Sequence, residues 1–167
     1  FIESGENIKT LPGVFELLKS IENTEIMPIN HVLVMGGATI QDVAGTALAL
    51  LKRGTSWTYV PTTLLSQTDS CIGSKTSING ISSKNMYGLF FSPKNIYIMF
   101  DFIKSLPEIE ILSGIGDAFH YLLLDVNQTY EYAIKILRTL SNNGLKKFVE
   151  VPENIYKLSS KIHKIKK

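Results

Sequence analysis

The residues of this 167-residue chain whose types could do chemistry gather between Val32 and Leu89. The second half of that segment holds an acid, two lysines and an amide with few hydrophobic neighbours: Asp69, Lys75, Lys84 and Asn85. Such residues are poor material for a core, whereas lysines and amides bind phosphate and carboxylate groups as point charges and donors. By charge alone the same run also fits a solvated surface loop. The first interpretation predicts a site for a phosphorylated or carboxylated small molecule beside a nucleotide.

A pair of glycines, Gly36-Gly37, follows an apolar run and precedes a helical pattern. Glycines at such a turn let the backbone approach a pyrophosphate, which the N-terminus of the helix stabilises. The pair is not the full G-x-G-x-x-G fingerprint, so a purely structural strand-to-helix turn fits it equally well. Asp42 is expected in the first turn of that helix, where the helix dipole also favours an acid.

Asp117 and His120 lie three residues apart in a helical pattern around Gly114. This spacing places both side chains on one face, as when a helix supplies two metal ligands. A zinc ion would need further ligands from elsewhere in the chain. On spacing alone, an exposed pair of an acid and a histidine is the alternative.

The elements that must position these residues alternate between strand and helix in the first part of the chain. Apolar runs predict strands at residues 32–35, 57–60 and 95–99, the first of them buried on both faces. Helical spacing covers residues 12–20 and 40–52. This alternation predicts a parallel α/β sheet.

Two shorter segments complete that part. Residues 63–70 are expected to form a short helix capped by a threonine. Residues 73–92 are rich in Gly, Ser and Asn and are expected to form a loop.

Beyond Lys104 the pattern becomes helical, with candidate helices at residues 111–124, 130–140 and 154–167. We therefore predict a boundary near Lys104. It separates a nucleotide-binding α/β part, residues 1–104, from the start of an all-α domain, residues 105–167.

Composition narrows the class of protein. With 44% hydrophobic and 19% charged residues the chain is ordinary globular material. A net charge of +2 is too small and too dispersed for a nucleic-acid surface, and no apolar run approaches the roughly 18–20 residues that span a bilayer. The single cysteine, Cys71, excludes a disulfide framework and is expected to be a small buried thiol. We expect a cytoplasmic protein that binds neither nucleic acid nor membrane.

Taken in order, the blocks GGATIQD, KRG, VPTTLL, QTDS, GSKTSIN and SKNMYG resemble 3-dehydroquinate synthase and the related sugar-phosphate cyclases. The resemblance covers Gly36 to about Tyr121, including the block LPEIEILSGIGD, and extends weakly to SGENIKT upstream. A generic dinucleotide-binding fold would not share the VPTTLL and KN blocks.

The resemblance implies roles for particular residues. The residues that would face NAD are Glu6, Lys9, Gly36, Gly37, Asp42, Thr62, Thr63, Lys84 and Ser105. Asp69, Lys75 and Asn85 would line the substrate site, and Arg53 would reach a substrate anion, in the neighbouring subunit of a homodimer. Asp117 falls where the family has a metal-binding glutamate, and His120 where it has a substrate-contacting lysine.

The reaction implied is that of a lyase of the shikimate pathway, which makes aromatic amino acids. A seven-carbon, DAHP-like sugar phosphate is transiently oxidised by NAD, loses phosphate, is reduced again and closes to a carbocycle. A divalent metal, zinc or cobalt, polarises the hydroxyl that is oxidised.

Departures from the family pattern leave alternatives open. Ala38 replaces the third glycine of the family's GGG, and the aspartate at position 117 is one methylene shorter than glutamate. The family's metal-binding histidines follow in an H-x-x-x-H type block, so we expect the chain to be the central portion of a cyclase. A cyclase acting on another sugar phosphate, a non-catalytic protein that binds NAD or dimerises, and a metal-dependent polyol dehydrogenase are the alternatives.

Overall fold

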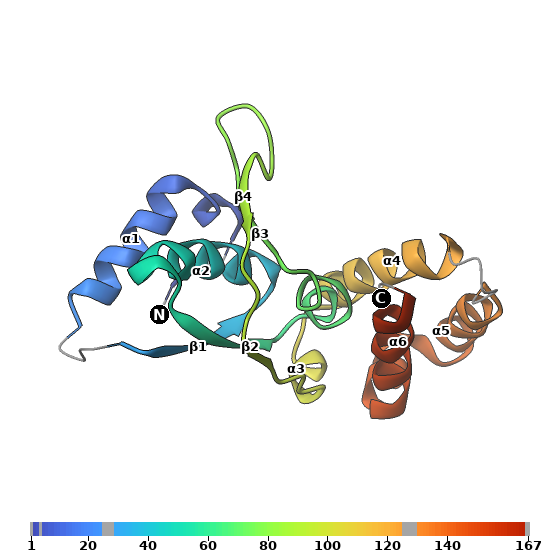
Figure 1. Ribbon diagram of the computed structural model, residues 1–167. Coiled ribbons are helices and arrows are strands. Elements are labelled where there is room, and N and C mark those ends of the chain that lie inside the picture. Colours follow the sequence, from blue (N-terminus) through green and yellow to red (C-terminus); the bar gives the residue numbers. More distant parts are fainter. Residues whose placement is uncertain (1, 4, 25–28, 125–129, 166–167) are drawn as a thin grey trace. The chain divides into compact units, whose positions relative to one another are not determined.

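The computed structural model describes residues 2–3, 5–24, 29–124 and 130–165 (Figure 1). The chain forms two compact units. Unit 1 comprises Phe1–Pro61 and Gly73–Tyr97, and unit 2 comprises Thr62–Ile72 and Ile98–Lys167. Each unit has its own apolar core, and each is described by itself.

These units differ from the predicted division at Lys104. Residues 62–72 belong to unit 2 because Leu64 is fully buried in its core, together with Ile103. Ile103 lies in α3 (Asp101–Lys104), so the residues just before Lys104 also pack with the helices that follow. Contact between apolar side chains therefore sets the boundary, where the sequence showed only a change of pattern. How the whole protein divides into domains stays a prediction.

Unit 1 is built on the expected parallel sheet. Its strands are β1 (His31–Gly36), β2 (Ser56–Pro61) and β5 (Asn95–Ile96), in the order β1-β2-β5. On the central strand, Trp57 and Tyr59 of one face and Thr58 and Val60 of the other face are buried, as a doubly covered strand requires. The predicted α/β class with a parallel sheet is confirmed.

The first strand is less buried than its apolar run suggested. Val34 is buried, whereas Leu33 and Met35 on the other face of β1 are exposed. This follows from the position of β1 at the edge of the three-stranded sheet, with α2 packed against one face. The expectation that β1 is buried on both faces is wrong for the described residues.

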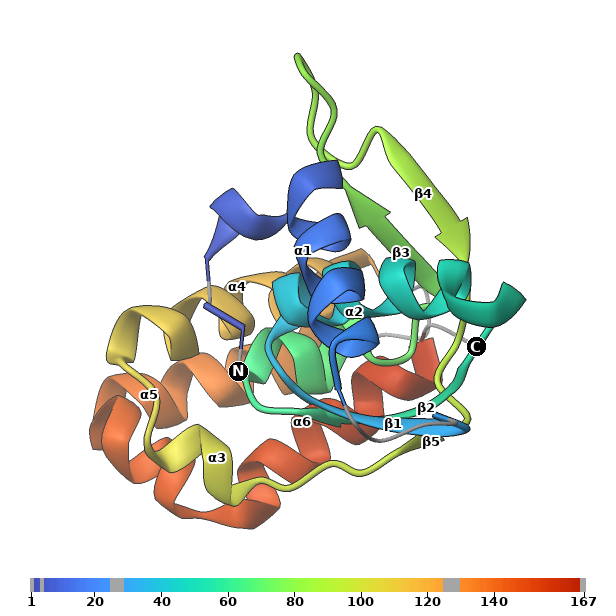
Figure 2. The same cartoon turned by 90° about the vertical axis from the view of Figure 1, so that its left-hand side faces the viewer.

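Two helices lie on the same side of this sheet, α1 (Leu11–Glu22) and α2 (Ala38–Leu50) (Figures 1 and 2). The Thr10 hydroxyl caps α1 by accepting a hydrogen bond of 3.2 Å from the Gly13 amide. Before α1 comes a single 3₁₀ turn, η1 (Glu6–Ile8). A small apolar cluster joins both helices to Ile78 of the strand β3 (Lys75–Ile78). Its buried members are Val14, Val43, Ala47 and Ile78.

Past its last turn, α2 runs into a 3₁₀ turn, η2 (Leu51–Arg53), and then Gly54. Lys52 and Arg53 have positive φ angles of 51° and 64°, and Gly54 follows at 116°. Left-handed conformations cost a non-glycine residue free energy, so this turn holds strain next to a predicted site residue.

The predicted loop at residues 73–92 is an antiparallel hairpin of β3 (Lys75–Ile78) and β4 (Tyr87–Phe90). The loop prediction is therefore wrong for those strands. Thr76 and Ile78 are buried, and β3 packs against α2, so tertiary contact overrides the turn-rich composition. Half of the Gly, Ser and Asn residues that suggested a loop lie in the connection between the strands, which extends away from the sheet (Figure 1).

Unit 2 is helical, as predicted for the later part of the chain. It contains η3 (Ser66–Ser70), α3, α4 (Glu108–Leu124), α5 (Tyr130–Glu150) and α6 (Pro152–Ile165). The expected short helix at residues 63–70 is mostly a π-helical turn, and its Thr63 hydroxyl accepts a hydrogen bond of 3.2 Å from the Ser66 amide. Lys166 and Lys167 lie outside the described residues.

Helix α4 packs closely on residues 62–72 through a glycine. A Cβ atom at Gly114 would lie 2.7 Å from both the Leu64 Cβ and the Leu65 backbone nitrogen. Only glycine therefore permits this approach. Ile111, Ile115 and Ala118 extend the same buried face of α4.

Candidate functional site

The glycine turn leaves the N-terminus of α2 open. Gly36 ends β1, and a Cβ there would lie 2.6 Å from the Ile40 Cβ. Gly37 is the N-cap residue of α2 and provides no side-chain cap. The first amides of a helix lack partners within the helix, so those of α2 remain free of a side-chain cap and suit an anion.

Asp42 lies beyond the first turn of α2, so the expectation of a first-turn acid is wrong. Its Oδ2 is 2.6 Å from the Lys9 Nζ, and its Oδ1 accepts a hydrogen bond of 3.0 Å from the Ser77 amide. The Lys9 and Asp42 side chains are 10% and 16% exposed. The Asp42 backbone oxygen also accepts from the Thr46 and Thr76 hydroxyls, at 2.8 and 2.9 Å. Asp42 therefore joins α2 to Lys9 on one side and to β3 on the other.

Asn79, which follows β3, makes a second set of connections. Its backbone amide donates to the Lys9 carbonyl at 2.8 Å, and its Nδ2 donates to the Glu6 Oε1 at 2.8 Å. Its Oδ1 accepts from the Asn85 amide at 3.0 Å. The Asn85 Oδ1 accepts from the Ser77 hydroxyl at 3.1 Å. One amide side chain thus holds the segment before α1 against the end of the hairpin connection.

The hydrogen bond from the Asn79 amide to the Lys9 carbonyl closes these contacts into a circuit, with Glu6 attached through Asn79. We call this set the polar ring: Glu6, Lys9, Asp42, Ser77, Asn79 and Asn85. Sequence reasoning picked out four of its members and missed Ser77 and Asn79. Both stand in the block KTSIN, two and four residues after Lys75. Because strand side chains alternate between faces, they share a face with Lys75, and that spacing is the signal that could have found them.

Lys75 and Lys84 are exposed on the same hairpin. Lys75 opens β3, and Lys84 immediately precedes Asn85, which has a φ of 55°. The two exposed lysines therefore belong to the same hairpin as Ser77, Asn79 and Asn85 of the polar ring.

Arg53 is not part of this group. It follows the C-terminal end of α2, separated from the glycine turn by the full helix, roughly 20 Å at 1.5 Å per residue. Its side chain is exposed. Its proposed reach into a neighbouring subunit stays a prediction.

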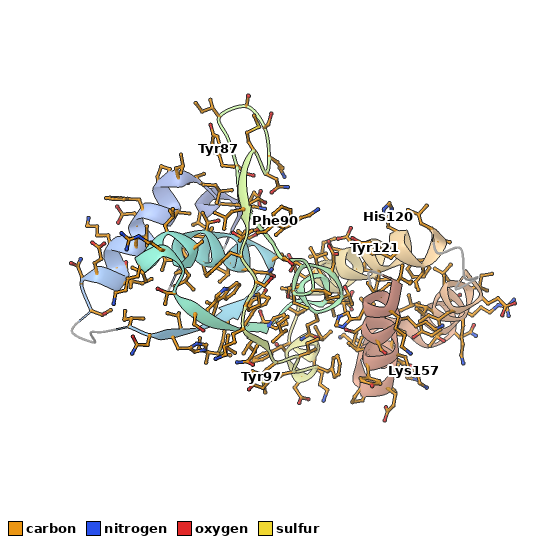
Figure 3. The ribbon with its side chains drawn as sticks, viewed as in Figure 1. Tyr87, Phe90, Tyr97, His120, Tyr121 and Lys157 are labelled. Carbon is orange, nitrogen blue, oxygen red and sulfur yellow. The ribbon has the colours of Figure 1, made fainter. Side chains whose placement is uncertain are left out.

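In unit 2, the predicted residues make local contacts. The Asp69 Oδ1 accepts a hydrogen bond of 2.9 Å from the Tyr121 hydroxyl of α4 (Tyr121 is labelled in Figure 3). The Thr63 hydroxyl, next to Thr62, donates to the Ser66 Oγ at 2.9 Å. Ser105 donates to the Phe102 carbonyl of its own turn at 2.9 Å. Their expected contacts with NAD stay predictions.

Asp117 and His120 are exposed on α4, and Figure 3 labels His120 there. The His120 ring meets the Tyr121 ring edge-on, with centroids 5.6 Å apart. Among the described residues, no three His, Cys, Asp or Glu side chains gather in a group that could hold a metal ion. The metal role of Asp117 stays a prediction.

Cys71 and the histidines His31 and His163 have partners within the protein. Cys71 is buried, as expected. The His31 ring nitrogens contact the Ser56 and Thr58 hydroxyls at 2.9 and 2.8 Å, and the His163 Nε2 is 3.0 Å from the Gln67 carbonyl. Within the described part of the chain, no helix has the length and apolar character needed to cross a membrane.

Comparison with known sequences points to one family. The family model for the N-terminal part of 3-dehydroquinate synthase matches residues 1–113. The 3-dehydroquinate synthase of Buchnera aphidicola subsp. Cinara cedri is 37% identical over 123 residues, which are 74% of this chain and 34% of that protein. That of Alkaliphilus metalliredigens is 36% identical over 131 residues, 78% of this chain and 37% of that protein. The chain thus spans about a third of the length of these curated relatives.

Solved structures share the fold. A 2-epi-5-epi-valiolone synthase from Streptomyces hygroscopicus subsp. jinggangensis, with NAD⁺ and Zn²⁺ bound, matches 98% of this chain and 44% of its own. Its TM-score is 0.82 and its sequence identity 24%. A 2-deoxy-scyllo-inosose synthase, complexed with carbaglucose-6-phosphate, NAD⁺ and Co²⁺, matches 98% of this chain and 42% of its own, with a TM-score of 0.78 at 21% identity. From the matched family model and the curated relatives, this chain belongs to the 3-dehydroquinate synthase family.

Proposed function

We propose that this chain forms the dinucleotide-binding part of a sugar-phosphate cyclase that converts a seven-carbon, DAHP-like sugar phosphate into a carbocycle with loss of phosphate. The observation that carries the proposal is the polar ring. It brings together residues from three separate blocks that resemble the family: Glu6 and Lys9 from the first, Asp42 from the second and Asn85 from the third.

The residues present fit NAD. The uncapped first turn of α2 offers backbone amides to a pyrophosphate, and Gly37 places no side chain in the way. Ala38 adds one methyl group where the family has glycine, which leaves those amides in place. NAD would accept a hydride from the sugar and return it, so the overall reaction shows no net redox change.

The chain's own residues would bind and orient the sugar phosphate. Lys75 supplies an exposed ammonium group that would neutralise phosphate or carboxylate of the sugar phosphate, whereas Lys84, also exposed, is assigned to NAD. Asn85 accepts from Ser77 through Oδ1, which leaves its Nδ2 group, a donor, without a partner among the described residues. In unit 2, taken by itself, the hydrogen bond from Tyr121 orients the Asp69 carboxylate, a group that can accept a hydrogen bond from a hydroxyl.

For the divalent metal, unlike NAD, the described residues do not form a complete binding site. The two cyclase structures contain zinc and cobalt, and Asp117 is the residue we assign as a ligand. The described residues do not gather a ligand set around it, so no step of the reaction is derived through a metal.

Turnover of the protein expressed from its complete reading frame, supplied with zinc or cobalt and NAD, tests the proposal. We expect one inorganic phosphate and one carbocycle per seven-carbon sugar phosphate, with no net NADH. Release of phosphate from a different sugar phosphate would keep the cyclase class and change the substrate. Net NADH formation from a polyol would instead identify a dehydrogenase, and NAD binding without any turnover would identify a non-catalytic relative.

A further inference from the structure

We infer that Asn79 is a positioning residue that fixes the Lys84–Asn85 turn against the Glu6–Lys9 segment, so that Asn85, proposed for the substrate, keeps a set separation from Glu6 and Lys9, proposed for the dinucleotide. The inference rests on the proposed function. It concerns a residue that itself contacts neither ligand in the proposal. Its basis is that Asn79 uses its backbone amide and both ends of its side chain at once, toward Lys9, Glu6 and Asn85.

The Lys84–Asn85 turn needs such support because of its backbone. Asn85 has a φ of 55°, in the left-handed region that costs a residue with a side chain free energy. The turn is exposed, so apolar packing does not hold it. Hydrogen bonds do: the Asn85 amide donates to the Asn79 Oδ1, and the Gly80 amide donates to the Ser83 carbonyl at 2.8 Å.

The chemistry of the amide makes Asn79 specific. Its Nδ2 must donate to the Glu6 carboxylate while its Oδ1 accepts from the Asn85 N–H. A carboxylate at this position keeps the acceptor but loses the donor, and it meets the Glu6 carboxylate as a like charge. An amide at position 6 would restore a donor to that carboxylate. Asn79→Asp should therefore be harmful alone and partly rescued by Glu6→Gln.

The first experiment measures hydrogen exchange in the chain without ligands, at the Asn85 amide and in peptides covering residues 79–86. Asn79→Ala removes the acceptor of the Asn85 N–H, and we expect exchange there to accelerate about tenfold, the effect of one ordinary hydrogen bond. Amides of the buried strand β2 should exchange at the wild-type rate. Ser83→Ala lies in the same connection and keeps the Gly80–Ser83 backbone bond, so it is the matched control and should change nothing. Unchanged exchange at Asn85 in Asn79→Ala would overturn the inference, whatever the protein's activity.

The second experiment measures NAD affinity by calorimetry, and KM and kcat for the sugar phosphate, in the protein from the complete reading frame. We expect Asn79→Asp to weaken NAD binding and raise KM about tenfold each, with kcat changed less than threefold. In the double variant with Glu6→Gln, the loss of NAD affinity and the rise in KM should be smaller than the product of the effects of the two single variants. Faster exchange at Asn85 with wild-type NAD affinity and KM would also overturn the inference. A wild-type protein that neither binds NAD nor turns over sugar phosphate would instead overturn the proposed function, and the exchange result would stand apart from it.

Discussion

The two units hold their candidate residues by different means. In unit 1, an acid of α2, a lysine near the start of the chain and two amides of the hairpin connection contact one another directly or through Ser77. In unit 2, Asp69 pairs with Tyr121, whereas Asp117 and His120 stand exposed on a helix whose other face fills an apolar core. Polar contacts therefore order the site in unit 1, and apolar packing orders the scaffold in unit 2.

The difference teaches how much of a site a scaffold alone determines. The polar ring fixes its own members, because each one is a hydrogen-bond partner of another. The packing of α4 fixes only the helix and the direction of its exposed face. We therefore expect the stability of unit 1 to fall most when a charge is removed, and the stability of unit 2 to fall most when apolar packing is disturbed.

The largest effect should come from the buried ion pair of the polar ring. Asp42→Asn removes the charge facing Lys9, and breaking such a pair while its partner stays buried should lower the free energy of unfolding by about 3 kcal/mol. Trp57, the single tryptophan, is buried in unit 1, so its fluorescence in a urea titration measures this loss.

Glu16→Gln is the control within unit 1, where Trp57 reports. It breaks the Lys19–Glu16 pair of α1, whose side chains are 59% and 67% exposed. Exposed pairs contribute less than about 1 kcal/mol, so this variant should unfold almost like the wild type. Equal losses in the two variants would contradict the view that burial makes the Lys9–Asp42 pair important.

The second prediction tests the packing of α4 in unit 2. Gly114→Ala places a methyl group 2.7 Å from Leu65 backbone, so α4 must move, and overpacking of this kind should cost about 2 kcal/mol. Gly116→Ala, two residues on in the same helix, meets no atom within 4 Å. It should stabilise the helix by about 0.5–1 kcal/mol, because alanine favours helix over glycine. The helical circular dichroism signal during unfolding measures both, and a loss in both variants would refute the packing argument.

A smaller effect is expected at the strained turn after α2. Lys52→Gly removes the penalty of a side chain at a φ of 51°, partly offset by the greater freedom of glycine in the unfolded chain. We expect a net gain of about 0.5–1 kcal/mol, seen as a higher urea midpoint in Trp57 fluorescence. Lys52→Ala keeps the penalty and should show no gain. If both variants gain, relief of strain is not the cause.

The smallest effect concerns pH and unit 2. Burial raises the pKa of the Tyr132 phenol above its ordinary value. The unfolded chain therefore loses this proton at a lower pH than the folded chain, and stability should fall as pH rises above about 10. Tyr132→Phe should flatten part of this decline between pH 9 and 11, measured as the midpoint of thermal unfolding. An unchanged decline would mean that other groups cause it.

Local patterns predicted the parallel sheet and the long helices, because apolar periodicity directly reflects which faces are buried. They failed for the hairpin, where Thr76 and Ile78 become strand residues only through contact with α2. They also explained Asp42 only by the dipole of its own helix. Its actual partners, Lys9 and Ser77, lie more than thirty residues before and after it in the sequence. Motif resemblance found four members of the polar ring but missed Ser77 and Asn79, whose side chains bind other protein groups and whose signal is only their spacing from Lys75 in the block KTSIN.

The hydrogen bond that Asn79 donates to Glu6 also limits how this sequence can evolve. An acid at one position requires a donor at the other, and Asn85 requires that the same side chain present an acceptor. Single changes at either position meet a mismatch, whereas paired changes do not. Among homologues, positions 6 and 79 should therefore vary together, and lineages that replace one should carry the compensating replacement at the other.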